Sequence, residues 1–243
     1  MTSCRGRSRH RLNAYESLPH QADCLPHQVR LSIEHANRQL IIEKLVSMLD
    51  DNPFDDVDGS WAQEQAAAAL ANLAQDSSDN RLSIVDAGGI APLLALLGGS
   101  ARAKENAVNA ITQLAYKSHA IQQRIADAGG VPLIANVLVS TCSNSKEMMG
   151  AVQLVNNTLR AVAQLCEGNR TNQSAMSDAN VIPALITVLS SPIAEMQANA
   201  AMALASIARN HADIQTAVAR TGAIAPLCGL VKDGTDEVSR IPV

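Results

Sequence analysis

Aromatic side chains are scarce in this sequence. They make up 2% of its 243 residues, whereas apolar residues as a whole make up 47%. A hydrophobic core must therefore be built from leucine, isoleucine, valine, alanine and methionine. Because long runs of alanine, leucine and glutamine favour helices over strands, the composition predicts an all-α fold.

Long apolar runs are missing too. The sequence has no stretch of about 18 apolar residues, so it predicts no membrane-spanning helix. The five cysteines are odd in number and include no Cys-x-x-Cys pair, which indicates reduced thiols in a cytoplasmic or nuclear protein. The net charge of −4 gives no sign of nucleic-acid binding.

Motifs of catalysis and cofactor binding are also absent. The sequence contains no nucleophile elbow, phosphate-binding loop or zinc-protease motif. The acidic segment at 51–59 lacks the first and last ligands of a calcium-binding loop. Cys166 falls on the apolar stripe of a predicted helix and is expected to be a small buried residue. We therefore expect no enzyme, no cofactor and no metal site.

Positive charge is concentrated at the N-terminus, in Arg5, Arg7, Arg9 and Arg11. Such a run predicts a basic, disordered arm over residues 1–27. A mitochondrial targeting segment is the alternative, but the apolar helical face that it needs is missing.

Four segments of the remaining chain resemble one another: DAGGIAPLLALL, DAGGVPLIANVL, DANVIPALITVL and RTGAIAPLCGLV. Their aligned turn residues recur at intervals of 41, 51 and 42 positions, at Gly88, Gly129, Asn180 and Gly222. A second landmark recurs with the same intervals, at Asn72, Gln113, Gln164 and Ser206. Such self-similarity predicts a stack of repeats.

An earlier copy of the pattern places a further turn at Asn37. The longer intervals are explained by insertions near 51–59 and 140–147, whose polar, turn-rich composition predicts loops.

Each repeat is predicted to contain three helices. A short first helix opens at a capping Asp or Asn and ends at Gly or Asn, residues that tolerate a left-handed backbone. A second helix begins near a proline, where the missing N–H costs no hydrogen bond. A longer third helix is rich in alanine and leucine, and stacked neighbours bury its apolar face.

The segments DNRLSIVDAG, GGI-x-P-L-L-x-L-L and AA-x-AL-x-NLA together resemble the armadillo repeat. The resemblance covers residues 28–243 and implies a right-handed superhelical solenoid with about four repeats and an incomplete fifth. Because the chain ends where another third helix should begin, we expect it to be a fragment of a longer protein.

The resemblance also implies a concave groove, in which a row of asparagines binds the backbone of an extended peptide. The corresponding positions are Asn72, Gln113 and Gln164, whereas Ser206 lacks the amide. One helical turn earlier the groove would present Asn109 and Arg160, and two turns earlier Glu64, Glu105 and Asn156. The alternative is that these positions are merely solvated polar residues.

The predicted function is a non-catalytic scaffold that binds an extended peptide or a helix. Because the repeat region is acidic, we expect this ligand to carry some basic residues. A nuclear import adaptor of the importin-alpha type is one alternative, although the positions four residues before the amide row carry no tryptophan. The repeat segment of a larger protein, such as an armadillo-containing ubiquitin ligase, is another.

Overall fold

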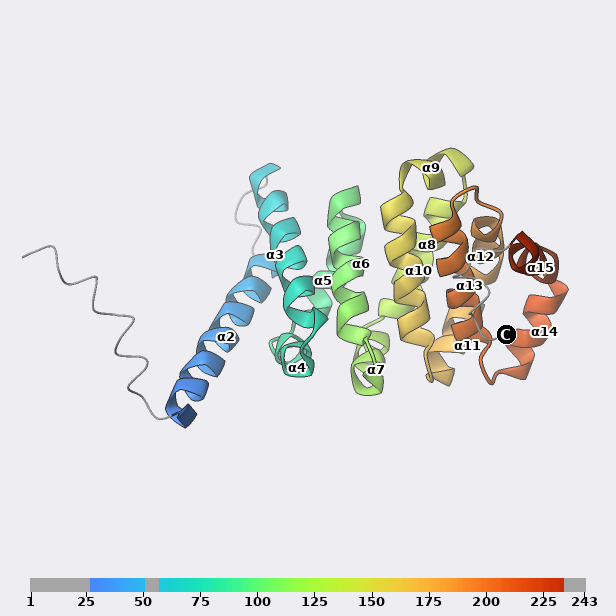
Figure 1. Ribbon diagram of the computed structural model, residues 1–243. Coiled ribbons are helices and arrows are strands. Elements are labelled where there is room, and N and C mark those ends of the chain that lie inside the picture. Colours follow the sequence, from blue (N-terminus) through green and yellow to red (C-terminus); the bar gives the residue numbers. More distant parts are fainter. Residues whose placement is uncertain (1–26, 51–56, 234–243) are drawn as a thin grey trace, which may run out of the picture. The chain divides into compact units, whose positions relative to one another are not determined.

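Helices of different lengths follow one another along residues 27–50 and 57–233, which are the residues described by the computed structural model (Figure 1). No strand occurs within these ranges, as the composition predicts. Contacts divide the chain into two units, Met1–Ile41 and Ile42–Val243, and the repeats from Gly88 onward lie in the second. The predicted basic arm up to residue 26 and residues 51–56 of the first insertion lie outside the described residues.

Three kinds of helix recur in the second unit, in the predicted order. The first helices are α4 (Ser78–Asp86), α7 (His119–Asp127), α11 (Arg170–Asp178) and α14 (Ala212–Arg220). The second helices are α5 (Ile90–Ala95) with η1 (Leu96–Gly98), α8 (Gly130–Cys142), α12 (Val181–Leu189) and α15 (Ile224–Asp233). The third helices are α3 (Val57–Gln75), α6 (Ala101–Ala115), α10 (Val152–Cys166) and α13 (Ala194–Ala208).

At the corner between first and second helices, one residue has a left-handed backbone conformation, with a positive φ angle. This confirms the predicted turn positions. The φ angles are 85° at Gly88, 78° at Gly129, 59° at Asn180 and 83° at Gly222. Glycine adopts this backbone without steric cost, and asparagine tolerates it better than most residues. The chain bends there by 85° between α4 and the α5–η1 pair, and by 80° between α7 and α8.

A second glycine at the corner allows two helices to approach closely. A Cβ atom on Gly130 would lie 2.6 Å from Ile125 Cγ2 and 2.8 Å from the carbonyl oxygen of the same residue. In the next repeat the corresponding residue is Val181, and Met176 replaces the isoleucine. Because methionine is not branched at Cβ, it leaves room for the valine side chain.

The third helices form one layer, in which α3 packs on α6, α6 on α10, and α10 on α13 (Figure 1). The second helices α5, α8 and α12 pack against α6, α10 and α13 respectively. Fully buried Leu70, Ile111, Leu159 and Leu185 belong to the core between these helices. This packing leaves another face of the third helices free of second helices.

The predicted loop near 140–147 is wrong, because most of it is helical. Helix α8 continues to Cys142, and a short extra helix, α9 (Ser145–Gly150), follows. The side chain of Asn144 accepts a hydrogen bond of 2.9 Å from the Lys146 N–H and caps this helix. A single capping residue thus allows a polar insertion to become helical.

The predicted turn at Asn37 is also wrong. Helix α2 (His27–Asp50) runs through this position without interruption. Its sequence contains neither glycine nor proline, so nothing in it favours a corner like those of the later repeats.

The caps of α4 and α7 are serines rather than the predicted Asp or Asn. The side chains of Ser77 and Ser118 accept hydrogen bonds from backbone amides in the first turn of these helices.

Candidate functional site

The predicted row of polar residues lies on one continuous face of the third helices. Asn72 is exposed on α3, and Gln113, Gln164 and Ser206 are half-buried on α6, α10 and α13. One turn earlier, Asn109 is half-buried and Arg160 is exposed. Because each of these helices packs on the next, the row crosses four neighbouring repeats.

Part of this face is hollowed. A cavity of about 250 Å³ is lined by residues from all four third helices or the turns that follow them, and we call it the amide hollow: Gln75, Asp76, Thr112, Gln113, Tyr116, Arg160, Gln164 and Met202. The structure therefore brings together three of the predicted site residues, Gln113, Gln164 and Arg160.

The amide of Gln164 keeps unused bonding capacity. Its Oε1 atom is buried and has no hydrogen-bond partner among the described residues. Its backbone carbonyl, by contrast, accepts a hydrogen bond of 2.7 Å from Gln122 Nε2 on α7. The backbone at this position is thus held in place, while the side-chain oxygen is a buried acceptor whose hydrogen-bonding capacity is unmet.

Glu64 and Asn156 need correction as groove residues, because both are buried between third helices. The Glu64 carboxylate accepts a hydrogen bond from Ser100 Oγ, and its backbone carbonyl accepts one of 2.8 Å from Asn106 Nδ2. The Asn156 Oδ1 atom accepts a hydrogen bond of 3.1 Å from Asn199 Nδ2. These contacts join neighbouring repeats, whereas Glu105, in the same row, is half-buried.

Tyr116 is a residue of the hollow that sequence reasoning missed. It forms the C-cap of α6 and is 38% exposed. The Arg81 guanidinium carbon lies 5.8 Å from the centre of its ring, and Lys117 Nζ lies 5.1 Å from it. The sequence does contain a sign of this role, because Tyr116 is one of few aromatic residues and lies three positions after Gln113.

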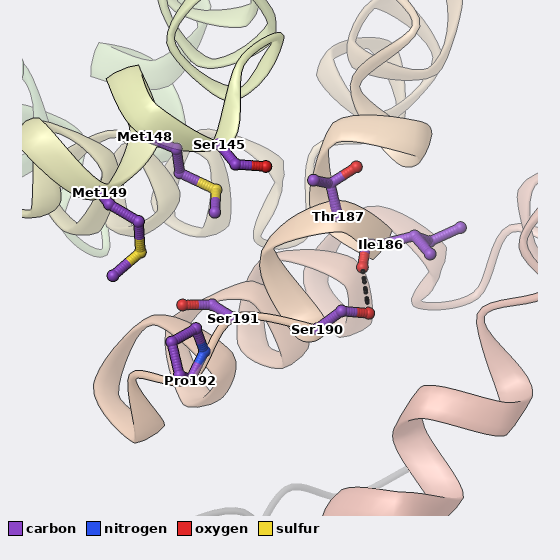
Figure 2. A pocket seen from close by; sticks show the side chains of 8 residues that line it. All are labelled: Ser145, Met148, Met149, Ile186, Thr187, Ser190, Ser191 and Pro192. Carbon is purple, nitrogen blue, oxygen red and sulfur yellow. Dashed lines mark hydrogen bonds between the residues drawn. The ribbon is translucent and has the colours of Figure 1, made fainter.

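A second cavity, of about 510 Å³, lies between the extra helix α9 and the end of α12 (Figure 2). We call it the methionine hollow, after Met148 and Met149 on α9. The other lining residues, all labelled in Figure 2, are Ser145, Ile186, Thr187, Ser190, Ser191 and Pro192. None of these side chains titrates near neutral pH, so the lining offers no general acid or base.

The described residues offer little to nucleophilic or metal chemistry. Cys166 is fully buried and Cys142 is nearly so. Burial raises the pKa of Cys142 to about 11 and that of Cys166 further, which keeps both thiols protonated. Within residues 27–50 and 57–233, no group of three or more His, Cys, Asp or Glu residues could hold a metal ion.

No single helix in the described ranges is long and apolar enough to cross a membrane. Two bent helix pairs have the length and composition of a membrane span, but by those two criteria only. They are α4 with α5–η1, and α7 with α8.

The armadillo/beta-catenin-like repeat matches residues 77–116 and 169–209. These ranges coincide with α4–α6 and α11–α13, two complete sets of three helices.

Solved structures of engineered proteins are similar over most of the chain. One engineered protein is 30% identical with a TM-score of 0.70, and the match covers 81% of this chain and 74% of the other. A computationally designed armadillo repeat protein for modular peptide recognition is 23% identical, with a TM-score of 0.69 and coverage of 82% and 77%. A designed armadillo repeat protein in complex with the peptide (KR)4 is 21% identical, with a TM-score of 0.69 and coverage of 92% and 95%.

No curated protein matches the sequence. The repeat match, the similarity to solved structures and the recurring three-helix corner nevertheless agree with one another. The chain belongs to the armadillo-repeat family.

Proposed function

We propose that this chain is a non-catalytic scaffold that binds an extended peptide across its third helices, in the cytoplasm or nucleus. The observation that carries the proposal is the amide hollow, in which Gln113 and Gln164 from adjacent helices line one cavity. A side-chain amide offers both a donor and an acceptor, as a peptide unit does, so successive amides can bind the backbone of an extended chain.

Two further observations support this proposal. The designed relatives include one for modular peptide recognition and one in complex with a peptide. The Oε1 atom of Gln164 is buried without a partner, and a peptide N–H would satisfy this acceptor if the side chain turned toward the hollow that it lines.

An import adaptor for lysine-rich cargo is less well supported. Arg160 lies on the face that such cargo would cover, and its charge repels lysine. The positions one turn before the amide row are Ala68, Asn109, Arg160 and Met202, and none of them is aromatic.

The proposal predicts that Gln113→Ala and Gln164→Ala weaken peptide binding without unfolding the protein. Random peptides displayed on phage are selected against the full chain, and the affinities of synthetic copies are measured by fluorescence anisotropy. We expect each substitution to weaken binding about fivefold, which corresponds to one lost hydrogen bond. The melting temperature should fall by less than about 2 °C.

Gln123→Ala provides the matched control. Gln123 lies on α7, outside the amide hollow, and its side chain donates only to Asp127 in the same helix. Equal losses of affinity in this variant and in the two groove variants would contradict the proposal, as would selected peptides that the groove variants bind unchanged.

A further inference from the structure

We infer that the amide hollow selects a peptide with an acidic side chain, which binds Arg160. This inference rests on the proposed function and goes further, because it states which side chain the peptide carries opposite α10.

Arg160 is a cation without a partner on this face. It is exposed on α10 and lines the hollow, and among the described residues its guanidinium makes no hydrogen bond or ion pair. Arg81, also near the hollow, is by contrast engaged: it donates to the carbonyl oxygens of Ala74 at 3.1 Å and Gln75 at 3.3 Å. Of these two arginines, Arg160 is the one that presents a free guanidinium fork to the hollow, and such a fork suits a carboxylate.

The hollow has one carboxylate among its lining residues, that of Asp76, which follows α3. Among the described residues no hydrogen bond or ion pair joins this carboxylate to Arg160, so the guanidinium is not already paired within the hollow. Arg81 is held at the end of α3, because its guanidinium donates to the carbonyl oxygens of the two residues that precede Asp76.

The neighbours of Arg160 complete a site for an acidic side chain. The amides of Gln113 and Gln164 supply additional N–H donors within the same cavity. Met202, 41% exposed on α13, adds an apolar surface on the far side. A carboxylate here would receive charge-assisted hydrogen bonds while its aliphatic stem or a neighbouring residue packs on methionine.

This inference reverses the expectation of a basic ligand, which rested on the acidic composition of the repeat region. Charges more than about 8 Å from the ligand are largely screened at physiological ionic strength. The local group, Arg160, therefore decides which side chain is bound, and the overall charge affects mainly the rate of encounter.

Three fluorescein-labelled peptides test the inference: (Glu-Thr)4, (Gln-Thr)4 and (Lys-Thr)4. Threonine favours an extended backbone, and eight residues span about 26 Å, enough to cross the hollow. We expect the full chain to bind (Glu-Thr)4 about five- to tenfold more tightly than (Gln-Thr)4 by fluorescence anisotropy, and (Lys-Thr)4 least tightly.

Arg160→Glu should abolish or invert this preference, and Arg170→Glu is the matched control because Arg170 is exposed on α11 outside the hollow. Both variants should keep the melting temperature of the unmodified chain. The inference is overturned if Arg160→Glu leaves the preference unchanged, if both variants remove it equally, or if none of the three peptides binds. Phage-selected peptides that still depend on Gln113 and Gln164 would then leave the proposed function standing.

Discussion

Polar side chains on the third helices fall into two groups, separated by one or two helical turns. Gln113, Gln164 and Arg160 line an open hollow, whereas Glu64 and Asn156 are buried and bonded to the next repeat. Each step of four residues rotates a side chain by about 40° around the helix axis, so two steps rotate it by about 80°. That rotation separates residues that can meet a ligand from residues that hold repeats together.

The cysteines give a prediction at the same scale. Cys142 and Cys166 should resist alkylation by iodoacetamide at pH 8 in the folded chain, because burial raises their pKa and blocks access. Cys228 is exposed and should react. Mass-spectrometric mapping of the modified peptides is the measurement, and rapid modification of Cys166 without denaturant would refute its burial.

The raised pKa of Cys142 makes the stability of the folded chain depend on pH. Burial raises the pKa of the Cys142 thiol from its ordinary value of 9.0 to about 11, so between these pH values the folded state keeps this proton while the unfolded state loses it. Stability should therefore fall as the pH rises from about 9 towards 11.

At the scale of the helices, the corner between first and second helices is the most constrained element. It combines a left-handed residue with a glycine whose missing Cβ lets two helices approach closely. Hydrogen bonds within a repeat then hold the end of its third helix, as when Gln173 Nε2 on α11 donates to the carbonyl oxygen of Ser206 on α13 at 2.9 Å. Both features fix the angle at which each repeat presents its third helix.

Gly130→Ala should destabilise the chain by about 1–3 kcal/mol, the cost of forcing extra volume into a packed core. The added Cβ would overlap Ile125 at 2.6 Å from Cγ2. Gly150→Ala is the control, because a Cβ at Gly150 meets nothing within 4 Å. Urea denaturation measures both variants, and equal stability of the two would show that the close approach at Gly130 is not needed.

At the scale of the whole molecule, the sequence predicts the repeats well because each corner depends on local backbone chemistry. Gly88 and Asn180 mark their turns by residue type alone, and the structure confirms both. Helix α9 was not predictable in this way, because its N-cap Asn144 stands in a polar segment whose composition favours a loop. The unbroken α2 is different, since its lack of glycine and proline is visible in the sequence and disfavours a corner at Asn37. The burial of Glu64 depends on the packing of α6 on α3, which no single repeat encodes.

The methionine hollow shows the same limit. It exists because the insertion after α8 folds as α9 and meets the end of α12. The polar, turn-rich composition of that insertion predicts a loop, and it gives no sign of a cavity. A test of peptide binding must therefore show which of the two hollows the peptide occupies.

A crystal structure of the full chain with (Glu-Thr)4 is the most direct test of the central claim. The account predicts an extended peptide across α6 and α10, with backbone hydrogen bonds to Gln113 and Gln164 and a glutamate carboxylate on Arg160. A peptide seated in the methionine hollow, or on the first helices, would contradict it.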